Sequence, residues 1–142
     1  MRIDARPWTR PGLRWGAVAA ALTFAACGGS SATTPNPTAT PTTDTFTGTL
    51  AAGGVDAHAF TVAQTGTLTV TLTTLSPQST ITVGLGLGQP SGTTCSITST
   101  DETAKMGSVE QVTVDAGSYC VAIYDLGNVQ ASDTFTITIT HT

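Results

Sequence analysis

Alternation of apolar and polar residues marks two segments, 66–73 and 134–140, as β-strands with one buried face. Residues two apart in a strand lie on the same face of a sheet, so the apolar residues should point into a core and the threonines to solvent. Threonine suits an exposed strand because its branched side chain fits the pleat while its hydroxyl stays hydrated. The expected inward residues are Leu68, Val70, Leu72, Phe135, Ile137 and Ile139, and the expected outward ones include Thr134, Thr136, Thr138 and Thr140.

Six further segments also have strand-like patterns, and clusters of Gly, Pro, Gln and Asn predict turns between them. No convincing amphipathic helix accompanies these segments. The pattern therefore predicts an all-β fold, an antiparallel β-sandwich of about eight strands that is jelly-roll-like. The six segments are Thr45–Leu50, Val55–Val62, Thr80–Leu87, Thr93–Thr98, Val109–Asp115 and Ser118–Tyr124.

A run of alternating glycines, Val83–Gly88, superficially resembles a phosphate-binding loop. Such loops hold an anion at the N-terminus of a helix, whereas this run leads into Gln89 and Pro90. We interpret the run as a strand whose backbone is closely packed against a neighbouring segment.

The first 26 residues have the pattern of a bacterial export signal. Four arginines lie in the first 14 residues, and Ala17–Ala26 carries no charge. Ten apolar residues are too few for a membrane-spanning helix, which needs roughly 20. Phe24, Ala25 and Ala26 then precede Cys27, and this stretch resembles the lipobox of bacterial lipoproteins.

The lipobox resemblance implies that residues 1–26 are removed and that Cys27 carries the lipid that anchors the chain in the membrane. The alternative is ordinary signal cleavage nearby, with Cys27 left as a free thiol. Lipidation would place the protein in the bacterial cell envelope, facing the periplasm or the cell exterior. Residues 27–44 are small, polar or proline and predict a disordered tether, and 45–142 should form one sandwich domain.

The acidic net charge of the chain beyond the export signal limits the kinds of molecule that it is expected to bind. Beyond the export signal the chain has eight acidic residues and a single basic one, Lys105. Such a surface does not neutralise phosphates, so nucleic acid is not an expected partner. Membrane attachment should come from the acylated Cys27, and the other expected partner is an unidentified protein or glycan.

The two remaining cysteines, Cys95 and Cys120, are candidates for a disulfide in an oxidising compartment. Two buried thiols or a pair of metal ligands are the alternatives, although no third ligand lies at zinc-site spacing. Alternation in Tyr119–Tyr124 puts Cys120 on the face opposite Val121 and Ile123, so the disulfide should lie on the outside of its sheet.

Other chemistry is weak in this sequence. Asp56 and His58 share a strand face, but a solvated or edge pair is a simpler interpretation than a catalytic one. Both histidines, His58 and His141, lie in or beside predicted strands, and no serine occupies a nucleophile elbow. Two acidic loop elements, Asp101-Glu102 and Asp125–Asn128, offer too few oxygens for firm calcium binding. We expect no enzymatic activity, no catalytic residue, no cofactor and no metal, and Tyr124 is the best exposed aromatic candidate for sugar contact.

Four segments, 46–50, 56–62, 66–72 and 116–124, together resemble the bacterial pre-peptidase C-terminal (PPC) domain. The resemblance covers about 45–142 and rests on strand and turn signatures. It implies a β-sandwich of the kind often appended to secreted proteases, some of whose relatives bind collagen or calcium. This chain departs from that pattern in its cysteine pair and in lacking a visible acidic cluster for calcium.

The expected function is a non-enzymatic, lipid-anchored β-sandwich acting as an adhesion, scaffold or protein-interaction module. One alternative is a carbohydrate- or calcium-dependent binding module. Another is an accessory or inhibitor of an extracellular protease. Glycan binding or a calcium-dependent melting shift would favour the first alternative, and loss of a protease's activity on mixing would favour the second.

Overall fold

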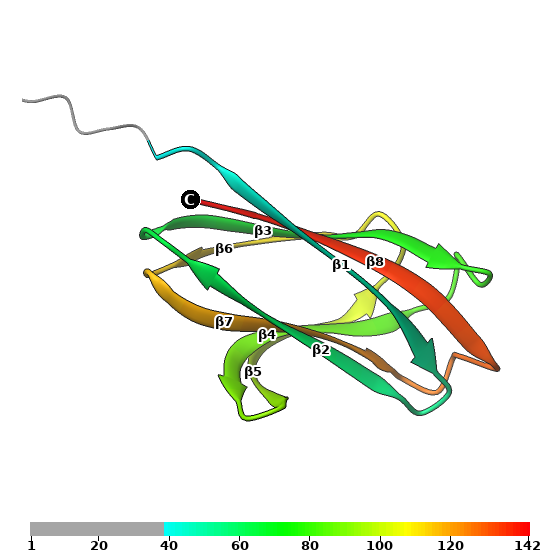
Figure 1. Cartoon of the computed structure of the whole chain (residues 1–142). Coiled ribbons are helices and arrows are strands. Elements are labelled where there is room, and N and C mark those ends of the chain that lie inside the picture. Colours follow the sequence, from blue (N-terminus) through cyan, green and yellow to red (C-terminus); the bar gives the residue numbers. More distant parts are fainter. Residues whose placement is uncertain (1–38) are drawn as a thin grey trace, which may run out of the picture. The chain divides into compact units, whose positions relative to one another are not determined.

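The computed structural model describes residues 39–142, which form two antiparallel four-stranded sheets packed face to face (Figure 1). The predicted antiparallel β-sandwich is confirmed. The strands are β1 (Thr42–Ala51), β2 (Val55–Val62), β3 (Gly66–Ser76), β4 (Val83–Ser91), β5 (Thr94–Ala104), β6 (Val109–Val114), β7 (Gly117–Asp125) and β8 (Ser132–His141). No helix in this part of the chain is long and apolar enough to cross a membrane.

The strand order is that of a jelly roll. One sheet has the order β1-β8-β3-β6 and the other β2-β7-β4-β5, so every connection except β4 to β5 crosses between sheets. As a result β1 pairs with β8 along its whole length, from Thr42 opposite His141 to Ala51 opposite Ser132. The first and last strands lie side by side (Figure 1).

The core lies between the two sheets and is built from the alternating residues that the sequence indicates. All six predicted inward residues of β3 and β8 are at most 1% exposed. They pack with aliphatic residues of β4 and β7, including Leu85 and Ile123. Burying each such side chain stabilises the fold by about 1.5–3 kcal/mol.

Threonine covers the outer face of the first sheet. The outward positions of β1, β8 and β3 carry no charged residue, and their side chains are exposed or half-buried. The predicted outward orientation of the β8 threonines is therefore confirmed. The outward threonines of these strands are Thr43, Thr45, Thr47, Thr49, Thr67, Thr69, Thr71, Thr73, Thr74, Thr134, Thr136, Thr138 and Thr140.

The glycines of β4 allow other groups to lie directly on the strand. Its aliphatic residues point into the core, while a Cβ on Gly84 would meet the ring of Tyr124 and one on Gly86 would meet Ile97. At Gly88 the obstacle is the backbone of Ser96. The interpretation of this run as a closely packed strand is confirmed.

Four strands have an end that lies three or more residues from its predicted position. One of them is β3, which continues to Ser76 rather than ending at residue 73. β1 begins at Thr42 rather than Thr45, because residues 42–44 pair with the end of β8. The assignment of 42–44 to the tether is therefore wrong. β4 covers Val83–Ser91 rather than 80–87, and β5 continues to Ala104 rather than ending at Thr98. Cys27, the predicted signal 1–26 and most of the predicted tether lie outside the described residues.

Candidate functional site

A disulfide holds the β4–β5 hairpin against the neighbouring strands. Cys95 of β5 and Cys120 of β7 are bonded, with their Cα atoms 5.7 Å apart. The predicted pairing is confirmed. Cys120 faces away from the core, as alternation indicates, yet only 2% of it is exposed. The structure thus adds a feature that the sequence did not indicate, a hairpin that bends over the outside of its own sheet.

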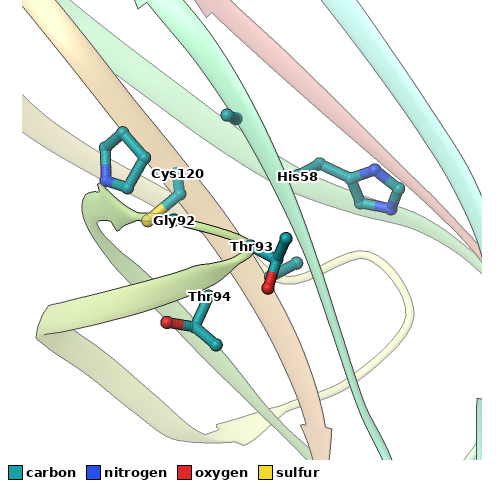
Figure 2. A pocket seen from close by; sticks show the side chains of 8 residues that line it. His58, Gly92, Thr93, Thr94 and Cys120 are labelled. Atoms are coloured by element: carbon teal, nitrogen blue, oxygen red, sulfur yellow. The ribbon is translucent and has the colours of Figure 1, made fainter.

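Two adjoining recesses lie between the bent hairpin and β2, and we call them together the hairpin groove. Figure 2 shows the one that is lined by His58 and Cys120. Their volumes are about 160 and 310 Å³. Ala57 of β2 and the hairpin-tip residues Thr93 and Thr94 line both of them. The remaining lining residues are Val55, Asp56, His58, Ala59, Pro90, Gly92, Cys95, Ile97, Cys120 and Ala122.

The hairpin groove has a floor of small side chains and one hydroxyl-bearing wall. Ala57 and Ala122 form part of the floor, and Thr93 and Thr94 form the wall. Figure 2 shows the His58 ring pointing away from Thr93 and Thr94, on the other side of β2. The groove can therefore hold a slender, largely uncharged group, while the imidazole is directed elsewhere.

Asp56 and His58 do share a face of β2, as predicted, and they lie on an edge strand. His58 Nε2 is 3.6 Å from Asp56 Oδ1, and the two side chains are 26% and 33% exposed. The His58 ring stacks on Phe46 of β1 with centroids 4.9 Å apart. This stacking fixes the ring between the two sheets, at the side of the sandwich where β1 and β2 are the edge strands.

A second carboxylate–imidazole pair joins β1 to β8 and was missed at the sequence level. His141 Nε2 lies 2.9 Å from Asp44 Oδ2, and His141 is only 3% exposed. The partners are 97 residues apart in the chain, so only the β1–β8 register brings them together. Asp133 was also missed: it is fully buried and accepts a hydrogen bond from the backbone N–H of Gln78.

The Asp125 carboxylate accepts hydrogen bonds from two loops, the one between β1 and β2 and the one between β7 and β8. Its Oδ2 accepts from the backbone N–H of Gly53 at 2.8 Å, and its Oδ1 accepts from those of Gly127, Asn128 and Val129. These bonds, led by that from Gly53, hold the pKa of Asp125 below its usual value. The predicted acidic loop element at 125–128 is thus a loop-stabilising cluster in which both carboxylate oxygens accept backbone hydrogen bonds.

The assignment of Asp101 and Glu102 to a loop is wrong, because both residues lie within β5. Asp101 Oδ1 accepts from the backbone N–H and the hydroxyl of Thr103 at 2.7 and 2.6 Å. Burial, reinforced by Asp101, raises the pKa of Glu110. Burial and the nearby carboxylates raise the pKa of Tyr124. Between residues 39 and 142, no three His, Cys, Asp or Glu side chains are grouped as metal ligands.

Tyr124, the predicted aromatic candidate for sugar contact, is half-buried at the end of β7. One side of its ring lies against the backbone of Gly84. The ring is therefore partly used in packing β7 against β4.

Comparison with known proteins assigns no family. No protein-family model matches the chain, and no curated protein matches it. The resemblance to the PPC domain stays a prediction based on its strand and turn signatures.

Proposed function

We propose that this chain is a non-enzymatic, lipid-anchored protein of the bacterial cell envelope whose β-sandwich acts as an adhesion, scaffold or protein-interaction module. The observation that carries the binding role is the hairpin groove. It is a preformed recess on the outer side of a sheet, and the Cys95–Cys120 disulfide fixes its wall. A recess that is shaped before binding loses less conformational entropy when a partner enters.

The carboxylate–imidazole pairs support a structural role better than a catalytic one. His58 is stacked on Phe46, and His141 is buried beside Phe60 with ring centroids 5.9 Å apart. Both imidazoles lie between the sheets at the β1–β2 side, where they link strands of the sandwich.

The proposed anchor rests on the export signal and on Cys27 in the sequence. Each buried CH₂ of an acyl chain contributes about 0.8 kcal/mol to membrane affinity, so two or more chains anchor durably. The described domain carries one lysine against eight carboxylates and is not expected to bind an anionic membrane by itself.

Cys27→Ala tests the anchor. We expect this variant to move from the membrane fraction to the soluble fraction, because it cannot be acylated. Ser31→Ala, four residues further along, is the matched control and should stay in the membrane fraction. Intact mass of the detergent-extracted wild-type protein should give a chain that starts at Cys27 and carries acyl mass. Equal membrane retention of both variants would refute the anchor.

The two alternatives from the sequence make different predictions. A carbohydrate- or calcium-dependent module should give glycan-array binding or a calcium-dependent rise in melting temperature. A protease accessory or inhibitor should change the activity of an extracellular protease on mixing. Either result, obtained with the wild-type protein, would displace the proposed function.

A further inference from the structure

The outer edge of β2 has unpaired backbone groups along its length. Among residues 39–142, β2 is the first strand of its sheet and pairs only with β7. The backbone N–H of Asp125 donates to the carbonyl of Gly54 at 3.0 Å, which places even-numbered residues in the hydrogen-bonded pairs of this ladder. The N–H and C=O groups of the odd-numbered residues Val55, Ala57, Ala59 and Thr61 therefore point away from β7, toward the free edge.

The same odd-numbered residues lie beside the hairpin groove. Successive side chains alternate between the faces of a sheet, and those of Val55, Ala57 and Ala59 lie on the outer face and line the groove. A recess and a row of free backbone donors and acceptors thus run along one strand. Val55, with 68% of its surface exposed, lies at one end of this row.

The other edge strands lack this combination. β1 also has a free edge, but neither recess is lined by any of its residues. On the opposite side of the sandwich, β6 spans only Val109–Val114, and β5 carries Asp101 and Glu102. Short edge strands and edge charges oppose the addition of a further strand.

We propose that β2 accepts an extended polypeptide segment as an added strand, with alternate side chains of that segment seated in the hairpin groove. This proposal rests on the proposed protein-interaction function and names its mode and partner class. Backbone hydrogen bonds to β2 supply affinity, and the recess beside the edge selects the side chains.

The groove defines the chemistry of the added segment. An added strand lies about 4.7–4.9 Å from β2, so its outward side chains come beside Ala57 and Ala59 and against the wall formed by Thr93. That space suits small, uncharged side chains. Acidic residues are disfavoured because the domain has a strong excess of carboxylates, eight against a single lysine. The partner is therefore an extended segment of small, non-acidic residues.

The probe is a random dodecapeptide display library selected against the processed protein in detergent, followed by a synthetic copy of the most enriched peptide. Hydrogen–deuterium exchange with mass spectrometry then locates the bound peptide. We expect enrichment of peptides that alternate small uncharged residues and that protect the amides of residues 55–61. Absence of enrichment, or protection at another strand, overturns the proposal.

Proline variants make the test specific to one edge. Ala59→Pro removes an edge-facing N–H without removing a β2–β7 hydrogen bond, and proline is tolerated at such positions. It should weaken peptide binding at least tenfold. Thr47→Pro is the matched control, because the bond from Ala52 N to Ala131 O places Thr47 N–H on the free edge of β1. It should leave peptide binding unchanged, and equal binding by both proline variants overturns the proposal.

A second variant, Ala57→Arg, tests the proposal if Ala59→Pro does not fold. Ala57→Arg keeps the backbone and fills the groove with a long side chain, so it too should reduce binding at least tenfold. Unchanged binding by Ala57→Arg overturns the groove's role. The outcome is separate from the anchor test. Membrane retention of Cys27→Ala would refute the anchor but nothing about β2, and failed peptide selection would leave the membrane anchor in place.

Discussion

Removal of the Cys95–Cys120 disulfide is expected to destabilise the sandwich strongly. The bond joins residues 25 apart in the chain. In the chain-entropy model, closing a loop of that length in the unfolded state contributes about 3.5 kcal/mol. The total unfolding free energy of a domain is about 5–15 kcal/mol, so the disulfide supplies a large part of it. For a domain of about 100 residues the melting temperature should fall by roughly 15–25 °C.

The perturbation is made in two ways so that packing and cross-linking can be separated. The double variant Cys95→Ala/Cys120→Ala removes the bond and both sulfur atoms, and reduction of the wild-type protein removes the bond alone. Because Cys120 is buried, the double variant should melt slightly below the reduced wild type. The single variant Cys95→Ala should match the reduced protein closely, since it leaves the buried sulfur in place.

Calorimetry and urea unfolding of the oxidised and reduced protein measure the effect. Both methods should report the same loss of free energy if the bond acts on the whole unfolded chain. Equal melting temperatures with and without reductant would refute the argument. A second refuting result is local opening of the hairpin, seen as faster hydrogen exchange at 88–97, with no change in global unfolding.

Three further predictions concern single residues. Asp125→Asn should lower the melting temperature at neutral pH. Folding lowers the pKa of Asp125, so its contribution to wild-type stability is complete above the unfolded-state pKa and is lost as pH falls through the folded-state pKa. The melting temperature of the variant should therefore depend less on pH in that acidic range. Gly88→Ala should cost about 1–3 kcal/mol in urea unfolding because its Cβ would meet the Ser96 backbone, whereas Gly117→Ala, with a nearest neighbour at 3.7 Å, should be close to neutral. Leu72→Ala should cost about 2–5 kcal/mol by the same assay, and a cost below 1 kcal/mol would contradict its place in the core.

The alternation of apolar and polar residues predicted the strands that have one buried and one solvent-exposed face. β3 and β8 alternate because one face of each is buried against the other sheet. β5 was predicted too short because most of its residues are exposed on both faces, so it has no apolar alternation to detect. Its continuation through Asp101 and Glu102 follows from pairing with β4, which no local signal indicates.

Some parts of the candidate site could likewise be predicted from the sequence, and others could not. The disulfide was predictable because only two cysteines remain after Cys27, and alternation gave its face. The bend of the hairpin and the groove beside β2 were not predictable, because they depend on where a distant segment crosses the sheet. Likewise the Asp44–His141 pair needs the β1–β8 register, which sets positions 97 residues apart side by side.

The pairing of β1 with β8 has a mechanical consequence. Thr42 and His141, at the two ends of the domain, are direct cross-strand neighbours, and the strands run antiparallel. A force that pulls these ends apart loads the ladder one residue pair at a time, so β1 should peel away from β8 at low force. A partner bound along β2 would load a different strand and would leave that pair of ends untouched. If the domain is attached to the membrane through the segment before β1, as we propose, the strand to which a partner binds determines whether β1 separates from β8 under tension.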